Sequence, residues 1–186
     1  MDFFKLVKQR TSVRKYLKDK TIPREDLVKC IEAARLAPSA CNAQPWKFIL
    51  VDDPDLKDRI CEKIFSGVYS VNKFAKNAAA LVVVVSEKEK FLSTLGGRIR
   101  DTRYYLIDIG IACEHLVLQA TELGIGSCWI GWFNEQPLKE LLKIPSSKKV
   151  DIVISLGYFD ETETSVKSRK SLDQTVSWNG YKGLTH

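Results

Sequence analysis

The spacing of apolar residues along the chain predicts a fold that contains both helices and strands. Apolar positions three or four residues apart are typical of a helix with one buried face, and short runs of branched or aromatic residues are typical of strands. Helices are expected over residues 3–9, with Asp2 as the N-terminal cap, and over about 23–36, about 54–65, about 98–123 and 135–143. Strands are expected over residues 46–51, 79–85, 128–130 and 150–157, the last with apolar residues at alternating positions 150, 152, 154 and 156. Because no repeat or linker divides the pattern, the simplest architecture is one mixed sheet covered by helices.

Two of these elements limit the architecture further. The strand from Ala79 to Val85 is apolar on both faces, which favours a central place in the sheet. The long helix is apolar nearly all round between Leu106 and Leu118, and Gly124 is placed to end it. Such a helix must be covered, and one small domain has difficulty enclosing it. We therefore expect it at the centre of the fold or in an interface between chains.

Length and composition indicate one globular domain. The chain has 186 residues, of which 45% are hydrophobic and 28% charged. A single domain is expected over residues 1–186, with a polar C-terminal extension from about residue 160. No apolar run approaches the roughly 20 residues that span a bilayer, and the N-terminus lacks the apolar block of a signal peptide. A cytoplasmic protein is expected.

Cysteine content and charge narrow the function classes. The five cysteines are Cys30, Cys41, Cys61, Cys113 and Cys128. An odd number without a Cys-x-x-Cys pair fits neither a disulfide framework nor a zinc site, so reduced and mostly buried thiols are expected. The net charge of +6 is compatible with nucleic-acid binding, but the lysines are spread along the sequence. A small anionic ligand explains the positive charge equally well.

The first candidate for chemistry is the segment Arg-Thr-Ser-Val-Arg at residues 10–14, which has an extended pattern. Alternation in a strand puts Arg10, Ser12 and Arg14 on one side. Two guanidiniums beside a hydroxyl form a donor array that suits a phosphate or the carbonyls of a planar heterocycle. Taken alone, the same triplet also suits a solvated basic strand edge.

The second candidate is the turn-rich segment 37–46, Ala-Pro-Ser-Ala-Cys-Asn-Ala-Gln-Pro-Trp, between a helix and a strand. It presents Ser39, Asn42 and Gln44 from irregular backbone, where binding groups are common. A helix stop followed by a strand start, with Trp46 in the core, is the alternative. That alternative explains the two prolines but not three polar side chains so close together.

Together these two segments resemble the paired signature of the nitroreductase family. Leu-Gly-Ile-Gly-Ser-Cys-Trp-Ile-Gly at 123–131 resembles the segment after the family's long helix, and Lys-Ser-Arg-Lys-Ser-Leu at 167–172 resembles its C-terminal basic cluster. The four matches occur in the family's order and span nearly the whole chain. The resemblance implies an α+β fold with a mixed, mainly antiparallel sheet covered by helices, and a long central or interface helix.

The resemblance also implies a cofactor and an assembly. An obligate homodimer would hold two FMN molecules in its interface, and Gly131 would place its backbone N–H near flavin N5. The residues expected to bind the cofactor are Arg10, Thr11, Ser12, Arg14, Pro38, Ser39, Ala40, Asn42, Gln44, Trp129, Ile130, Gly131, Lys167 and Arg169, with Asn72 and Lys73 as looser matches. Within this set, the partner chain would supply residues 38, 39, 40 and 42.

The reaction implied is hydride transfer from NAD(P)H through the flavin to a nitroaromatic, quinone or related acceptor, by a ping-pong mechanism without a catalytic side chain. Some larger relatives carry an acidic residue where Gly131 stands, so a contact with nicotinamide is missing here. The segment 86–94 is also short for the lid found in deiodinases and dehalogenases. A flavin-binding carrier or sensor without nicotinamide turnover therefore remains an alternative, as does a basic nucleic-acid-binding protein.

Three further residues are expected to be structural. His115 lies in the apolar part of the long helix without partners at metal-like spacing, which favours a packed histidine. Cys41 and Cys128 adjoin the motifs, but no general base accompanies either thiol. Nucleophilic catalysis is therefore not expected, and no metal site is predicted.

Overall fold

The computed structural model describes residues 2–87, 102–160, 162 and 167–181. A four-stranded sheet with the strand order β1-β2-β4-β3 lies at its centre, and every neighbouring pair of strands is antiparallel. The strands are β1 (Trp46–Val51), β2 (Ala80–Ser86), β3 (Gly126–Ile130) and β4 (Lys149–Gly157). One isolated parallel bridge joins Ser12 to Ser127 at the β3 edge.

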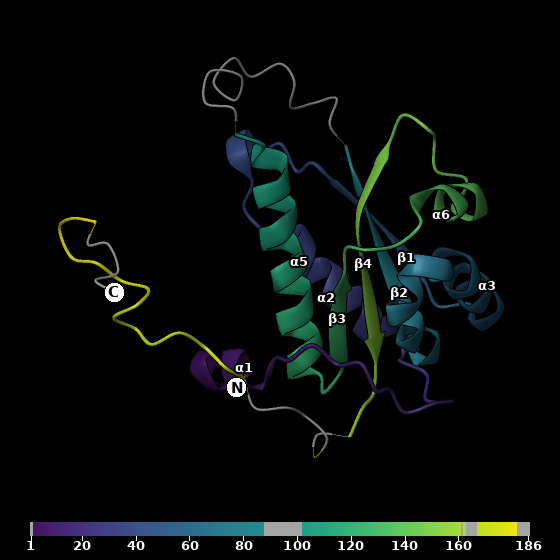
Figure 1. The fold of residues 1–186 in the computed structure, drawn as a ribbon, viewed down its shortest axis with the longest axis horizontal. Coiled ribbons are helices and arrows are strands. Elements are labelled where there is room, and N and C mark those ends of the chain that lie inside the picture. The colour runs from purple at the N-terminus through teal and green to yellow at the C-terminus, as the bar shows by residue number, and fades with distance from the viewer. Residues whose placement is uncertain (1, 88–101, 161, 163–166, 182–186) are drawn as a thin grey trace.

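Helices cover both faces of this sheet, which confirms the α+β class (Figure 1). They are α1 (Phe3–Gln9), α2 (Arg24–Arg35), α3 (Pro54–Ile64), α5 (Tyr104–Glu122) and α6 (Glu135–Leu142). Two 3₁₀ segments, η1 (Ala40–Asn42) and η2 (Gly67–Asn77), were not anticipated from the sequence pattern. Helices α2 and α5 lie on one face, and α3 and α6 on the other.

The predicted central position of the second strand is confirmed by β2, which pairs on both sides and is buried along its whole length. Val82 and Val84 pack with α2 and α5 in what we call the α5-side core. Leu81 and Val83 pack with α3 and α6 in the α3-side core. Each fully buried valine contributes roughly 1.5–3 kcal/mol to the stability of the fold, so one strand stabilises both layers.

Strand β4 departs from the regular alternation that the sequence suggests. Val84 pairs with Ile152 but Val85 pairs with Val150, so Asp151 is an extra residue in a β-bulge. As a result Ile152 packs toward the α5-side core whereas Val150 packs in the α3-side core. The bulge therefore shifts the side-chain alternation by one residue.

Helix α5 begins at Tyr104, and the predicted residues 98–101 lie outside the described residues. Its end is as predicted, because Gly124 adopts a left-handed φ of 71°. The N–H of Ile125 donates to the carbonyl of Ala120 at 2.8 Å, which is the long bond of a Schellman motif. The chain consequently turns directly from α5 into β3.

Within the part of the chain that the structure describes, one side of α5 is covered. Ile109, Ala112 and Leu116 are buried against the sheet and α2. On another side, Leu106 and Ile107 are 40% and 52% exposed. No helix among the described residues has the length and apolar character that a membrane span requires.

Candidate functional site

A cavity of about 970 Å³ lies between the end of α1, the end of α5 and the first described residues of the C-terminal tail. It brings together segments that are distant in the sequence. Its lining consists of Val7, Lys8, Gln9, Arg10, Thr11, Val13, Glu114, Thr121, Gly124, Ile125, Gly126, Phe159, Lys167 and Arg169. Four of the predicted cofactor residues, Arg10, Thr11, Lys167 and Arg169, therefore share one cavity.

The end of α1 positions the basic residues. Asp2 caps the start of this helix by accepting from Lys5 N–H, as predicted, and Arg10 is the C-cap. The Nζ of Lys167 donates to the carbonyl of Val7 at 3.1 Å and also to the carbonyl of Lys8. Free carbonyls at a helix C-terminus attract cations. This contact joins Lys167, in the C-terminal tail, to helix α1.

The charges of the cavity are unbalanced. Among the described residues of its lining, four side chains are basic and one, Glu114, is acidic. Burial lowers the pKa of Lys167, and the positive charges of Arg10 and Arg169 lower it further. Neighbouring positive side chains repel one another, and an anion that accepts hydrogen bonds from several of them stabilises the group. The cavity therefore has the chemistry of an anion-binding site.

Glu114 on α5 is the local counter-charge. Its Oε1 lies 3.9 Å from Nε of Arg10, and its side chain is 47% exposed. Burial raises the pKa of this carboxyl, whereas the charge of Arg10 lowers it. An incoming anion would compete with Glu114 for Arg10.

The segment after Arg10 runs along the edge of β3. The N–H of Val13 donates to the carbonyl of Ser127 at 2.9 Å, and Val13 is buried. Ser12 and Arg14 are exposed and do not line the cavity, whereas Thr11 does. Arg10 therefore does not share a strand face with Ser12 and Arg14, because it is the C-cap of helix α1.

Gly126 allows the cavity wall to form. A Cβ at this position would lie 2.6 Å from Cδ1 of Phe159 and 2.7 Å from Cγ2 of Val13, so only glycine fits. Sequence reasoning included Gly126 in a motif but did not assign it a role, and it missed Thr121, Phe159 and the part played by Glu114. Their roles depend on which segments meet at the cavity, for which the sequence carries no local signal.

The second motif forms a constrained loop around η1. The N–H of Ala40 donates to Oδ1 of buried Asp108 at 3.0 Å, and the N–H of Gln44 donates to Oγ of Ser39 at 2.9 Å. The side chain of Gln44 donates to Oδ1 of Asn42 at 3.1 Å. Pro38, which precedes Ser39, is exposed.

Three non-glycine residues of this loop have left-handed backbone. The φ angles of Cys41, Asn42 and Gln44 are 52°, 52° and 47°. Such residues are uncommon, cost conformational energy and cluster at functional loops. The other carboxylate oxygen of Asp108 is buried and has no hydrogen-bond partner among the described residues. The loop is thus held rigidly, but one acceptor beside it is still available.

The loop and the cavity lie at opposite ends of α5 within one chain. Asp108 contacts the loop near the start of α5, whereas Thr121 lines the cavity near its end. Thirteen residues of helix separate them by about 20 Å at 1.5 Å per residue. Figure 1 shows η1 beside the first turn of α5 and α1 beside its last turns. One chain therefore does not bring the first two motifs together.

The third motif leads away from the cavity along β3. From Gly126 to Gly131, five extended residues span about 17 Å. Ile130 is buried in the α3-side core, and Trp129 packs against the α5-side core. Gly131 is exposed just after the strand. The described geometry therefore leaves the backbone of Gly131 accessible.

Asn72 and Lys73 lie on η2, which is distant from Gly131 in sequence, but Asn72 contacts the residue that follows Gly131. The Nδ2 of Asn72 donates to the carbonyl of Trp132 at 2.8 Å. Lys73 is exposed on the same segment. Asn72 therefore contacts the protein backbone next to Gly131.

The remaining reactive groups have structural roles. Nδ1 of His115 lies 3.3 Å from the carbonyl of Ala33 on α2, in keeping with a packed histidine. All five cysteines are free, and only Cys41 is exposed, as the sequence predicts. Burial raises the pKa of the Cys30, Cys61 and Cys113 thiols to about 12 and also raises that of Cys128. No metal-binding group of His, Cys, Asp or Glu occurs within the described residues.

Comparison with known proteins identifies the family. The model of the nitroreductase family matches residues 7–73 and 69–158. An oxygen-insensitive NADPH nitroreductase of Helicobacter acinonychis is 30% identical, over 93% of this chain and 94% of the relative. An iodotyrosine deiodinase of Thermotoga neapolitana is 29% identical, over 85% of this chain and 89% of the relative.

A solved structure agrees with these relatives. An FMN-dependent nitroreductase of Clostridium difficile R20291 has a TM-score of 0.74 and 30% identity, over 96% of this chain and 100% of the other. The fold is thus that of an oxidoreductase family. The chain belongs to the nitroreductase family.

Proposed function

We propose that this protein is an FMN-dependent oxidoreductase that takes hydride from NAD(P)H and reduces nitroaromatic, quinone or related acceptors by a ping-pong mechanism. The observation that carries the proposal is the cavity in which Arg10, Lys167 and Arg169 converge around the Glu114 carboxylate. A phosphate dianion requires several charge-assisted donors when it leaves water, and this cluster supplies them. The residues present therefore fit the phosphate end of FMN.

The other motifs have complementary roles in this proposal. Thr11 and Ser12 would bind the phosphate or ribityl chain, and Arg14 would lie at the pyrimidine edge, where positive charge favours reduced flavin. Gly131 would offer its exposed N–H to the ring, beside the backbone of Trp129 and Ile130. FMN, when bound, supplies the N5 atom that accepts hydride and later delivers it. No side chain is assigned an acid or base role.

We further propose a homodimer whose interface contains the two flavins. The separation between the loop of residues 38–44, which is held at Asp108, and the cavity, which is lined by Glu114 and Thr121, supports it. Along α5 these residues lie about 9 and about 20 Å from Asp108, so a second chain is needed to complete one site. In this assembly Pro38, Ser39, Ala40 and Asn42 would face the flavin of the partner. The loop around η1 is already ordered by Asp108, so little conformational entropy is lost on binding.

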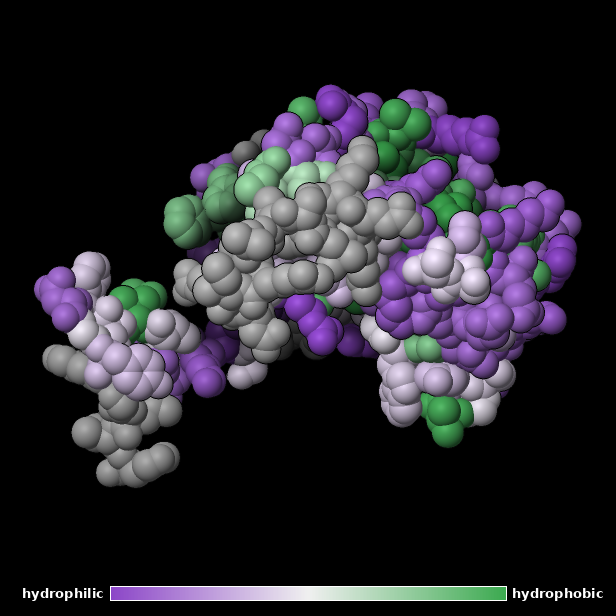
Figure 2. Space-filling model, turned by 90° about the horizontal axis from the view of Figure 1, so that it is seen from above, coloured by the Kyte–Doolittle hydropathy of each residue, from purple (hydrophilic) through white to green (hydrophobic). Residues whose placement is uncertain are grey.

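Exposed apolar residues support the same assembly. Ile107 on α5 is 52% exposed, and Leu172, Trp178 and Tyr181 on the tail are 76%, 81% and 97% exposed. Figures 1 and 2 show that the described part of the tail extends away from the body of the chain. Apolar side chains on an extended arm gain free energy when a second molecule covers them.

The visible spectrum of the purified protein tests the cofactor, and anaerobic addition of NADH or NADPH tests the reductant. We expect bound FMN that is bleached by one or both nucleotides and reoxidised by a quinone or nitroaromatic. An iodinated tyrosine belongs among the acceptors tested, because one relative is a deiodinase. A protein that neither retains nor rebinds FMN would refute the proposal, and bound FMN without bleaching would instead favour a carrier or sensor.

Variants of the cavity test the phosphate assignment separately. Arg10→Ala and Arg169→Ala should release FMN while the free energy of unfolding of the flavin-free protein changes little. Lys170→Ala is the matched control, because Lys170 is a neighbouring basic residue that does not line the cavity. Equal FMN retention in all three variants would contradict the assignment.

A further inference from the structure

The segment η2 holds the backbone that follows Gly131. The Nδ2 of Asn72 donates to the carbonyl of Trp132 at 2.8 Å. From the same segment, the ring of Tyr69 meets the ring of Trp132 edge to face, with centroids 5.8 Å apart. Trp132 is therefore fixed by both a polar and an aromatic contact, whereas its own side chain is 57% exposed.

Gly131 itself is held by little else. It is exposed, and a Cβ built on it would have Cδ1 of Ile152 at 3.7 Å as its nearest neighbour, which is an ordinary contact. Among the described residues, no tight contact fixes the position of this glycine. The next fixed point of the backbone is Asn134, whose N–H donates to the carbonyl of Ile64 at 3.0 Å. Between β3 and Asn134, the contacts of Trp132 therefore help to set where the backbone lies.

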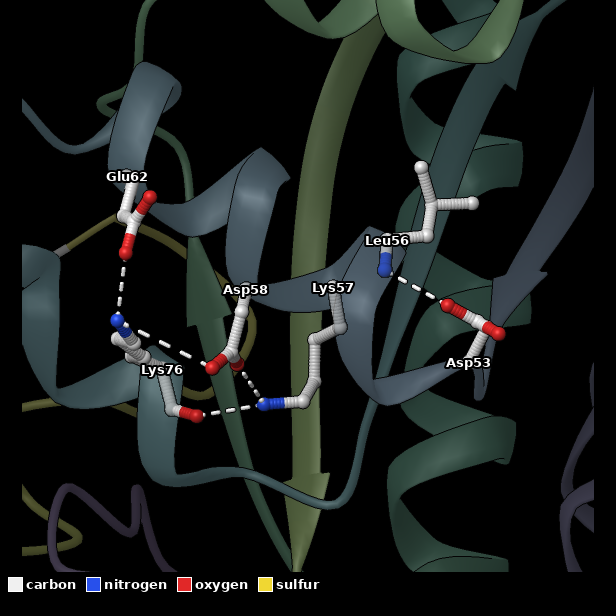
Figure 3. A network of polar contacts seen from close by, with 6 residues as sticks. All are labelled: Asp53, Leu56, Lys57, Asp58, Glu62 and Lys76. Atoms are coloured by element: carbon white, nitrogen blue, oxygen red, sulfur yellow. Dashed lines mark hydrogen bonds and ion pairs between the residues drawn. The ribbon is translucent and has the colours of Figure 1, made fainter.

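The other end of η2 is fixed by a buried lysine on α3. Lys57 is only 7% exposed, and its Nζ donates to the carbonyl of Lys76 at 2.6 Å and to Asp58 at 2.8 Å. The ammonium of Lys76 in turn binds Glu62 at 2.7 Å. Figure 3 shows Lys57 directed at the Lys76 carbonyl, with Asp58 between the two ammonium groups. A buried ammonium needs such partners, so this end of η2 has little freedom.

These end contacts matter because η2 has little stability of its own. It covers eleven residues, and only Ala75 is buried. Hydrogen bonds in 3₁₀ helices have poorer geometry than in α-helices, and runs beyond three or four residues are uncommon. The segment therefore keeps its shape through α3 at one end, the loop after β3 at the other, and Phe74, which packs against buried residues between them.

We propose that Asn72 is a positioning residue that fixes the Gly131–Trp132 backbone, and that Lys57 anchors the segment from which Asn72 acts. The inference rests on the proposed function, in which the Gly131 N–H faces the flavin ring. A backbone donor assists a reaction only when it is held in place beforehand. A lysine on the opposite face of the sheet would in this way influence the flavin site.

The test compares Asn72→Ala with Asn77→Ala, an exposed asparagine at the end of the same segment. In the flavin-free protein, hydrogen exchange of the peptide that contains residues 131–133 should rise about fivefold in Asn72→Ala, as expected for one lost hydrogen bond. In the flavin-loaded protein, the rate of reduction by NAD(P)H should fall and the visible band of the flavin should change shape. Asn77→Ala should resemble the wild type in all three measurements.

The anchor is tested by Lys57→Met against Lys63→Met, an exposed lysine on the same helix. Lys57→Met should raise exchange in η2 and in residues 131–133, and Lys63→Met should not. This pair decides the question if Asn72→Ala does not fold.

Two results would overturn the proposal. Unchanged exchange at residues 131–133 in Asn72→Ala would mean that Asn72 does not hold this backbone. Slower flavin reduction with unchanged exchange would instead make Asn72 a direct flavin contact. If the wild-type protein binds no flavin, the proposed function fails, while the exchange measurement still decides whether Asn72 holds the loop.

Discussion

Replacement of Glu114 by Gln should tighten FMN binding, although it removes a residue from the binding cavity. In the flavin-free chain the Glu114 carboxylate lies 3.9 Å from Arg10 and forms an ion pair with it. The FMN phosphate would have to compete for the same guanidinium. After binding, the same carboxylate repels the phosphate. Glutamine keeps the size of the side chain and removes both effects.

The magnitude follows from the distance and the exposure. With Arg10 between them, Glu114 and a phosphate oxygen would be about 6 Å apart, where two unit charges interact by about 0.7 kcal/mol in water and about 2.8 kcal/mol at an effective dielectric constant of 20. Because Glu114 is 47% exposed, the lower part of this range applies. A gain of about 0.7–1.4 kcal/mol corresponds to a dissociation constant about three to ten times smaller.

Fluorescence titration of flavin-free protein with FMN and with riboflavin measures this effect. Riboflavin lacks the phosphate, so its affinity should be the same in wild type and Glu114→Gln. Glu122→Gln, with the same charge change on the same helix but outside the cavity lining, is the control. Weaker FMN binding in Glu114→Gln, or equal gains for both flavins, would refute the electrostatic reasoning.

Three further changes test other parts of the structure. Gly126→Ala should lower the free energy of unfolding by about 1–3 kcal/mol through overpacking and reduce FMN retention, whereas Gly180→Ala, which has open space around it, should do neither in thermal melts and spectra. Glu135→Gln should cost about 1–2 kcal/mol at pH 7. Burial opposes ionisation of Glu135, but hydrogen bonds from two lysines and a backbone N–H hold its pKa at about 2. In urea unfolding the difference from wild type should therefore be complete above the ordinary pKa of 4.5 and disappear as the pH falls toward 2; a constant difference would contradict this. Ile107→Glu should give monomers without FMN in sedimentation experiments, while Val28→Glu, on exposed α2 surface, should remain dimeric; a dimeric Ile107→Glu protein would contradict the proposed interface.

Much of the fold could be predicted because local patterns dominate it. Short-range chemistry accounts for the first helix with its Asp2 cap, for strand β2 with apolar residues on both faces, and for the glycine that ends α5. The segment η2 was missed, since a long 3₁₀ run has no strong sequence pattern and here depends on Lys57 and Trp132. The bulge at Asp151 was also missed, because it is set by the pairing of β4 with β2.

The candidate site likewise has features that the sequence motifs identified and features that depend on how the chain folds. The motifs keep their order and chemistry along the chain, so they were enough to identify the family, the α+β class and the residue types suited to a phosphate and a planar ring. The folded chain was needed to show that Arg10 and Thr11 meet Lys167 and Arg169 in one cavity with Glu114 as their counter-charge. The folded chain also shows that the Asn42 loop lies at the other end of α5 and that Asn72 contacts the backbone beside Gly131. These arrangements join residues far apart in sequence, and their geometry is fixed by packing around the sheet.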